Sequence, residues 1–246
     1  MSPTVLYPLT LAGLLHHVLA TQSAATTTTV IVCSSRHDFL HHLSQSLDQH
    51  PSGARNGHGR LQDLANPSLH ILLTARRVTL AFCASVQTLL AYLAAYRGNP
   101  SPRANAGADK TRLFLVNPLA LHASTLSFSA QGLSRSFAAA TETALQAGAA
   151  LHVVECHSKG KALGHHPGSE GLETGREDVA HVATIGEANE DPWEQEVSIL
   201  NVSARRFGSH NGERAWAGRT VKANRIAARW FRFEKVDNCS TRDGQG

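Results

Sequence analysis

One stretch of the sequence decides the fold: Leu113-Phe114-Leu115-Val116-Asn117-Pro118-Leu119-Ala120-Leu121. Its first four residues form the most strand-like run in the chain, because a short apolar run of this kind is typical of a buried strand. Similar runs occur on either side of it, at residues 30–33, 78–82 and 151–154. The sequence therefore predicts four strands.

Segments with helical spacing alternate with these runs. Apolar side chains recur there every three or four residues, which predicts helices that bury one face. The longest of them begins at Ser129, whose hydroxyl we expect to cap the helix, and is closed by Gly148. Strands that alternate with helices predict a parallel sheet covered on both faces. The predicted helices are residues 9–21, 38–47, 86–96 and 129–146.

The last third of the chain changes character. Residues 157–190 are rich in Gly, His, Glu and Ser and contain few apolar residues, so we expect a long flexible loop there. Beyond it, residues 197–204, 220–228 and 230–233 predict antiparallel strands, with a turn between the first two. We expect residues 237–246 to form a disordered tail. No repeat or linker divides residues 1–246, which predicts a single domain.

Composition excludes several classes of protein. The hydrophobic share of 42% is too high for a disordered chain. The sequence contains no run of 18 apolar residues, so neither a membrane-spanning helix nor a membrane partner is expected. The four cysteines form no CxxC pair, which argues against a disulfide framework or a zinc site. Adjacent histidines such as His16 and His17 point about 100° apart on a helix and do not chelate a metal together. The net charge of +4 permits a polyanionic partner.

The order of elements resembles the core of RecA-type recombinases. Residues 9–20 look like the helix after the phosphate-binding loop, 30–43 like the second strand and its helix, and 74–92 like the next pair. Residues 113–121 look like the Walker B strand, and 129–135 resemble the Ser-Ala-Arg-Gln segment that opens the family's next helix. Residues 197–233 resemble the basic terminal hairpin. The resemblance implies an α/β fold with a RecA-like core, a mostly parallel central sheet flanked by helices and a C-terminal antiparallel hairpin.

Two departures from the family's pattern concern nucleotide chemistry. The phosphate-binding motif G-x-x-x-x-G-K-[ST] is absent, and the residues before Leu9 are too few to contain both that loop and its strand. Asn117 stands where the Walker B carboxylate would help to hold Mg²⁺, and a neutral amide is a weak ligand for a hard cation. We therefore expect a degenerate ATPase fold without enzymatic activity and without a cofactor.

Charge is distributed unevenly near the carboxyl terminus. Residues 201–236 hold nine basic and two acidic side chains, a net charge of +7, whereas residues 156–196 hold three basic and nine acidic ones, a net charge of −6. The basic hairpin is the better candidate for phosphate contact, which arginine favours by bidentate bonding. The alternative is that these basic residues form a solvated face or pair with the acidic loop. The candidate DNA-binding residues are Arg205, Arg206, Arg219, Lys222, Arg225, Arg229 and Arg232, with Lys159 and Lys161 at the start of the loop.

Two details of this hairpin add to the prediction. On a strand over residues 219–225, odd positions share one face, so Arg219 and Arg225 would point the same way. Aromatic residues accompany the arginines and would either stack on bases or belong to the core or a subunit interface. These aromatic residues are Trp216, Trp230, Phe231 and Phe233.

The resemblance implies a non-catalytic recombinase paralogue, similar to the small RecA-fold subunits of recombination-mediator assemblies such as the Shu complex. Such a subunit would act in the nucleus in homologous-recombination DNA repair. It would bind the DNA phosphate backbone and another RecA-fold subunit, as a heterodimer or within a larger complex. The accessory subunits of Elongator are the alternative, because they also have RecA folds without a phosphate-binding loop and form a ring that binds transfer RNA. A structural adaptor without nucleic-acid contact is the third possibility.

Overall fold

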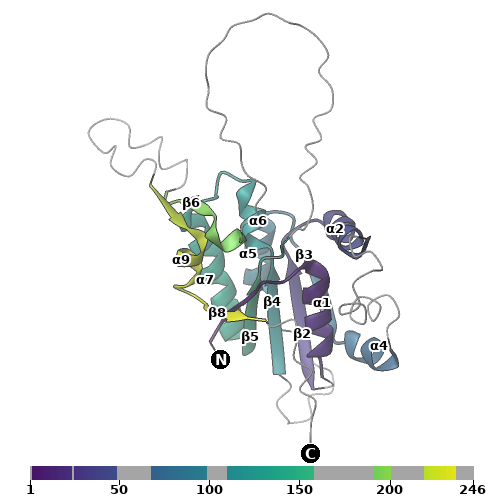
Figure 1. Ribbon diagram of the computed structural model, residues 1–246. Helices are drawn as coiled ribbons and strands as arrows, with labels where there is room; N and C mark the ends of the chain where they lie inside the picture. Colours follow the sequence, from purple (N-terminus) through teal and green to yellow (C-terminus); the bar gives the residue numbers. More distant parts are fainter. Residues whose placement is uncertain are drawn as a thin grey trace, which may run out of the picture.

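A six-stranded sheet runs through the centre of the molecule (Figure 1). The computed structural model describes residues 2–23, 25–48, 68–98, 110–157, 191–200 and 219–236. The strand order is β3-β2-β4-β5-β1-β8, and every neighbouring pair is parallel. The strands are β1 (Thr4–Tyr7), β2 (Thr26–Val32), β3 (Val78–Phe82), β4 (Lys110–Val116), β5 (Ala149–Val154) and β8 (Arg232–Lys235).

Two apolar cores lie on the two faces of this sheet. On one face, Val30 and Phe114 pack beneath α1 (Leu11–Ala20) and α2 (Arg36–Asp48), and α4 (Leu69–Ala75) packs against α1. On the other face, Ile31 and Leu115 pack beneath α5 (Val86–Ala95), α6 (Pro118–Ala123) and α7 (Ala130–Gln146). Because successive residues of a strand point to opposite faces, a strand buried on both sides must be apolar throughout, as Leu113–Val116 is.

The helix ends form where the sequence predicts them. The hydroxyl of Ser129 accepts a hydrogen bond from the Gly132 N–H at 3.1 Å, which confirms its predicted role as an N-cap. Gly148 lies at φ +59°, a left-handed conformation that ends α7 and that glycine adopts without strain. The predicted helix at 86–96 and the strand at 151–154 are likewise confirmed within one or two residues.

The C-terminal region confirms the antiparallel hairpin and corrects two of its details. Strands β6 (Glu196–Ser198) and β7 (Thr220–Lys222) pair antiparallel, preceded by the short 3-10 helix η1 (Pro192–Glu194). The strand predicted over 220–228 ends at Lys222, because the next residues form the helix α9 (Ala223–Ala227) and bury an apolar side against α7. The predicted antiparallel strand at 230–233 is instead β8, which joins the central sheet parallel to β1.

The first residues form a strand of the central sheet. β1 occupies Thr4–Tyr7 between β5 and β8, and Pro8, Leu9 and Thr10 connect it to α1. Val5 and Leu6 are almost fully buried, so four residues suffice for a strand that has a neighbour on each side. The predicted loop beyond His157 and the predicted tail at 237–246 lie outside the described residues. In the described part of the chain, no helix is both long enough and apolar enough to cross a membrane.

Candidate nucleic-acid interface and the carboxyl edge of the sheet

The loop from β1 to α1 lies at the carboxyl edge of the sheet, where parallel α/β folds bind their ligands. It contains only Pro8, Leu9 and Thr10. Leu9 is buried, forms a bridge with Cys156, and accepts a hydrogen bond from the His157 N–H at 3.0 Å. The Thr10 hydroxyl accepts from the Gly13 N–H at 3.1 Å. The loop is thus tied to the end of β5, and this first-turn amide is occupied by a protein side chain.

Asn117 follows β4 at the same edge. Its backbone lies at φ +59° and ψ +43°, the left-handed region that asparagine tolerates better than most residues. Its side-chain Oδ1 accepts from the Cys156 N–H at 2.8 Å, and its own N–H donates to the Val154 carbonyl at 2.8 Å. Asn117 therefore joins the ends of β4 and β5 and uses its side-chain oxygen within the protein.

Glu155 is the buried acid at this edge, and the sequence analysis did not single it out. One carboxylate oxygen accepts from the Leu119 N–H at 3.0 Å and the other from the Ala120 N–H at 2.9 Å, so it caps the start of α6. Burial raises the pKa of Glu155 to about 7, although these two N–H bonds act in the opposite direction. An acidic residue directly after the apolar run at 151–154 was the signal that would have found it.

The same edge also contains two buried thiols. Cys33 and Cys83 follow β2 and β3, and both are free and almost fully buried. Burial raises the pKa of each thiol, so both are held in the protonated form. Within the described ranges, no three His, Cys, Asp or Glu side chains are grouped closely enough to hold a metal ion.

A second polar cluster lies on the α1 face of the sheet. Arg112 of β4 donates to Thr28 at 3.2 Å and to both Thr21 and Gln22 at 2.8 Å, which ties β4 to β2 and to the end of α1. Nearby, the ring of His152 bonds to the Thr4 hydroxyl at 2.7 Å. Burial, with the Arg112 charge as the next cause, lowers the pKa of His152 to about 4. The histidine is therefore neutral at physiological pH.

The predicted DNA-binding residues fall into two groups. Arg219, Lys222, Arg225, Arg229 and Arg232 lie in the described part of the chain, and all five are exposed. Arg205, Arg206, Lys159 and Lys161 lie outside the described residues. The expectation that Arg219 and Arg225 share a strand face is wrong, because the strand ends at Lys222 and Arg225 belongs to α9.

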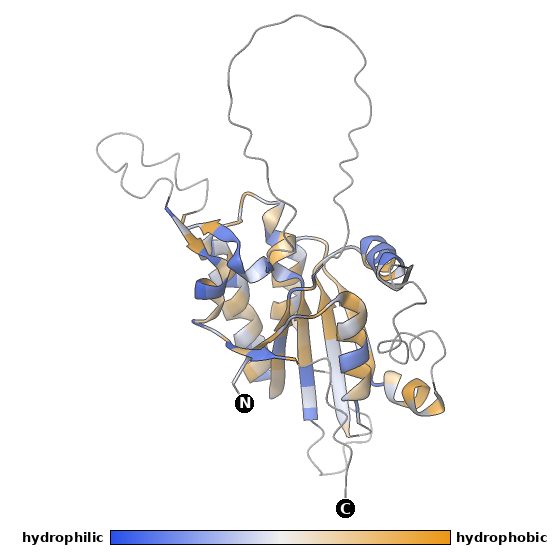
Figure 2. Ribbon diagram, in the orientation of Figure 1, coloured by the Kyte–Doolittle hydropathy of each residue, from blue (hydrophilic) through white to orange (hydrophobic). Residues whose placement is uncertain are grey.

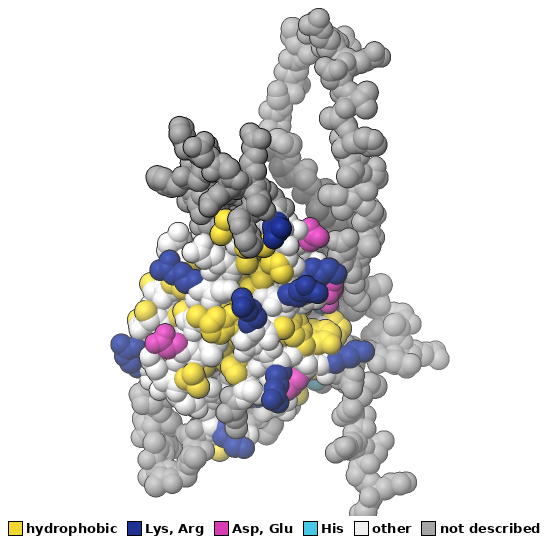
Figure 3. Space-filling model, turned by 90° about the vertical axis from the view of Figure 1, so that its left-hand side faces the viewer, with side chains coloured by type: hydrophobic (Ala, Val, Ile, Leu, Met, Phe, Trp, Pro, Cys, Tyr) yellow, Lys and Arg dark blue, Asp and Glu magenta, His cyan; other side chains and the backbone are white. Residues whose placement is uncertain are grey.

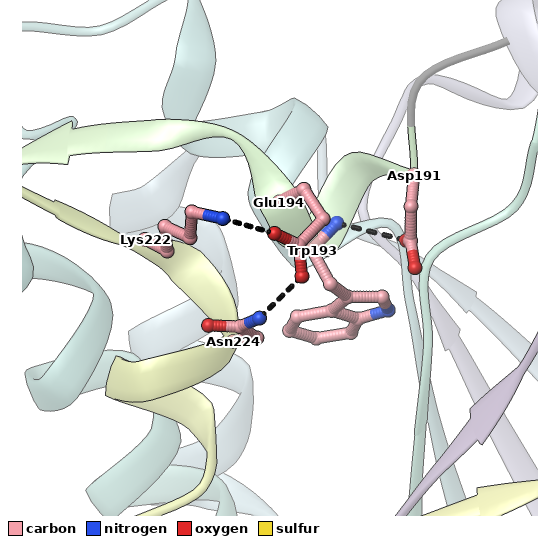
Figure 4. A network of polar contacts seen from close by, with 5 residues as sticks. All are labelled: Asp191, Trp193, Glu194, Lys222 and Asn224. Carbon is pink, nitrogen blue, oxygen red and sulfur yellow. Dashed lines mark hydrogen bonds and ion pairs between the residues drawn. The ribbon is translucent and has the colours of Figure 1, made fainter.

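Lys222 is neutralised by a protein carboxylate (Figure 4). Its ammonium donates to Oε2 of Glu194 at 2.6 Å, and the amide of Asn224 donates to the other oxygen of the same carboxylate at 2.5 Å. These bonds lower the pKa of Glu194 and keep it ionised. Close by, Asp191 accepts from the Trp193 N–H at 3.0 Å. The network joins η1, β7 and α9, so Lys222 has a structural contact of its own.

Arg225, Arg229 and Arg232 differ from Lys222 in this respect. Within the described ranges they make no ion pair and no side-chain hydrogen bond. They are exposed, and Ala223, Ile226 and Ala227 of the same helix are buried. Figure 3 shows the side of the molecule that carries α9 and β8, where Lys and Arg side chains outnumber Asp and Glu and lie between apolar ones. We call Arg225, Arg229 and Arg232 the arginine group.

The aromatic residues near the arginine group belong to the core. Phe231 is 5% exposed and packs edge-on against Phe137, with ring centroids 5.1 Å apart. Phe233 contacts the rings of Trp193 and Tyr7, and Trp230 is partly buried against the same core. Their faces are occupied by protein, which favours the core alternative over base stacking. Trp216 lies outside the described residues.

Comparison with known proteins gives few relatives. No protein-family model matches the chain, and no curated protein matches it. Among solved structures, a DnaB-like replicative helicase, described together with its interactions with primase, is similar at 12% identity and a TM-score of 0.38. That likeness covers 64% of this chain and 39% of the helicase chain, and nothing below depends on it. The α/β fold rests on the parallel sheet, its flanking helices and the terminal hairpin.

Proposed function

We propose that this chain is a non-catalytic RecA-like subunit of a nuclear recombination-mediator complex, which binds the DNA phosphate backbone and another RecA-fold subunit during homologous-recombination repair. The observation that carries the nucleic-acid part is the arginine group, three exposed guanidinium groups without a carboxylate partner in the described part of the chain. Arginine forms paired, charge-assisted hydrogen bonds with phosphate oxygens, so such groups favour a polyanionic partner.

The non-catalytic part is supported by the carboxyl edge of the sheet. A phosphate-binding loop needs backbone N–H groups that face the ligand, and here Thr10 already occupies the Gly13 N–H. A magnesium site needs oxygen ligands that face the solvent, and the side-chain oxygens of Asn117 and Glu155 accept bonds from backbone N–H groups. We expect the chain to bind no MgATP, which isothermal titration of the purified chain checks.

The test of nucleic-acid binding is a salt titration with forked DNA, measured by fluorescence anisotropy. Three phosphate contacts predict a slope of about −2.7 in log K against log salt on duplex DNA, so affinity falls roughly 40-fold between 50 and 200 mM salt. Replacing Arg225, Arg229 and Arg232 by Gln together is expected to abolish most of that slope. Lys110→Gln, which removes an exposed charge at the amino end of β4, is the matched control and should change little.

The Elongator alternative uses the same arginine group, because phosphate contacts carry no sequence information and suit transfer RNA equally well. Competition between transfer RNA and forked DNA for the chain separates the two. Preference for forked or single-stranded DNA supports the mediator role. Preference for transfer RNA, together with assembly into a six-membered ring, would overturn it. An adaptor without nucleic-acid contact predicts no salt-dependent binding to either.

A further inference from the structure

The two edges of the central sheet are built differently. At one end, β8 carries three charged residues in four positions, Arg232, Glu234 and Lys235, and charge on an edge strand discourages pairing with another strand. At the other end, β3 has the sequence Val-Thr-Leu-Ala-Phe without any charge. It pairs only with β2, so in the described structure its outer row of backbone N–H and C=O groups has no strand partner. Among the described residues, the β3 edge is therefore open to a further strand.

A row of exposed leucines lies next to this edge. Leu69, Leu72 and Leu73 of α4 are 79%, 50% and 65% exposed, and their i, i+3, i+4 spacing puts them on one side of the helix. Leu80 of β3 is 44% exposed. Figure 2 shows α4 as a hydrophobic helix at the outer side of the molecule, and Figure 1 identifies it. With Leu40, these make five of the seven large exposed apolar residues in the described part of the chain.

The Leu80 side chain and α4 lie on the same face of the sheet. Leu80 is paired in register with Val30, whose side chain belongs to the core beneath α1, and α4 packs against α1. Only Arg76 and Arg77 separate α4 from β3. An added strand at the β3 edge would therefore place every second side chain over Leu80 and toward the leucines of α4. We call β3 with Leu69, Leu72 and Leu73 the leucine edge.

Charge around the leucine edge specifies its partner further. Residues 68–98, which build α4, β3 and α5, contain Arg76, Arg77 and Arg97 and no acidic residue. Arg76 is exposed and lies two residues before β3 begins. A partner strand with carboxylates beside Arg76 is attracted electrostatically, whereas a partner with basic residues there is repelled. The expected occupant is therefore apolar in the middle and acidic at its end.

We propose that the leucine edge binds a β-strand supplied by another polypeptide, with apolar side chains at every second position and carboxylates beside Arg76. Main-chain hydrogen bonds to β3 would hold the strand, and the leucines would select its side chains. This inference rests on the partner part of the proposed function, for which it names the surface. It is independent of the arginine group.

The test uses the full chain and two fluorescein-labelled peptides with the same core, Val-Thr-Val-Thr-Val. One has Asp-Glu at both ends, so that either strand direction brings carboxylates to Arg76, and the other has Lys-Lys at both ends. We expect the acidic peptide to bind about fivefold more tightly, the size of one exposed ion pair. Arg76→Glu should reverse this preference, a result that a general loss of structure does not produce.

Leu80→Lys places a charge on the β3 edge strand, as β8 already has, and a charged edge discourages pairing with another strand. We expect this variant to bind both peptides about tenfold or more weakly than the wild type. The matched control is Leu145→Lys, an exposed leucine on α7 that is 71% exposed and is not part of the leucine edge. Unchanged DNA binding by Leu80→Lys keeps this test separate from that of the arginine group, and an unchanged melting temperature shows that the variant folds.

Three results would overturn the proposal. The first is that neither peptide binds the wild-type chain saturably, and the second is that Leu80→Lys and Leu145→Lys bind the peptides alike. The third is that the chain self-associates in sedimentation experiments and that Leu80→Lys alone abolishes this, because the occupant would then be a second copy of the same chain.

Discussion

Asn117 shows how one residue can determine both a turn and a chemical property. The resemblance predicts that Asn117 stands where a carboxylate would serve a metal ion; in the structure, its amide oxygen accepts from the Cys156 N–H in a left-handed turn. An asparagine is suited to both tasks, since its short side chain tolerates a positive φ and presents a neutral acceptor. The backbone conformation and the bond to Cys156 together account for an asparagine at this position.

Substitution of Asn117 separates these two contributions. Asn117→Gly keeps the left-handed backbone and removes the acceptor, and we expect a loss of about 1 kcal/mol in the free energy of unfolding. Asn117→Ala removes the acceptor and also strains the backbone, so about 1 kcal/mol more should be lost. Urea denaturation of both variants measures the difference. Equal stability of the glycine and alanine variants would contradict the argument from φ.

At the scale of elements, the network on Glu194 decides how much charge the hairpin offers to a polyanion. Glu194 holds Lys222 and Asn224 and thereby links η1 to β7 and α9. The arginine group has no such partner in the described residues. The net charge of a segment therefore overstates its capacity to contact phosphate, because one of its cations is already neutralised.

The pairing of Lys222 with Glu194 predicts different effects for two variants of the network. Glu194→Gln leaves Lys222 without its carboxylate, so one more phosphate contact becomes available and the slope of log K against log salt should steepen by about 0.9. Lys222→Gln removes a cation that is already neutralised and should leave the slope nearly unchanged. Anisotropy titrations with forked DNA at four salt concentrations measure both. A larger loss for Lys222→Gln than for Arg225→Gln would show that the carboxylate does not shield the lysine.

The elements that the sequence predicted correctly share one property, which is strong local patterning. The run at 113–116 is apolar throughout and the run at 151–154 is apolar except for His152, because strands buried on both faces cannot alternate. The helix at 130–146 has both a cap and a closing glycine. The errors occur where tertiary contacts determine the structure. Residues 223–227 form a helix because Ala223, Ile226 and Ala227 pack on α7. Five residues are too few for a helical repeat of apolar residues to be recognised in the sequence.

The candidate site was predictable only in part for the same reason. Exposure of the arginines follows from composition, but the pairing of Lys222 with Glu194 joins residues 28 positions apart. Likewise, Glu155 reaches α6 across 35 and 36 positions, and nothing local in the sequence shows that its two oxygens cap a helix. Side-chain contacts between distant segments are fixed by the fold, so they become visible only in the structure.

At the scale of the whole molecule, two sets of buried groups act on stability in opposite directions as pH changes. The pKa of Glu155 is raised from 4.5 to about 7, so between these values the folded state binds more protons than the unfolded state and stability falls as pH rises. The pKa of His152 is lowered from 6.5 to about 4, so in that window the unfolded state binds more protons and stability rises with pH. Burial also lowers the pKa of His17 and His122, which adds to the second trend.

These opposing trends predict the pH profile of two variants. Glu155→Gln removes the contribution that falls with pH, so the free energy of unfolding from urea denaturation should rise more steeply than that of the wild type between pH 4.5 and 7, by about 3 kcal/mol over the window. His152→Gln removes a contribution to stability that rises with pH. The free energy of unfolding of this variant should therefore rise less with pH than that of the wild type, or should fall. Each variant is compared with the wild type as a difference in slope, which separates titration from a uniform loss of packing. Parallel profiles for Glu155→Gln and the wild type would mean that the Glu155 carboxyl titrates alike in the folded and unfolded chains, and its burial beneath α6 would then have no consequence for proton binding.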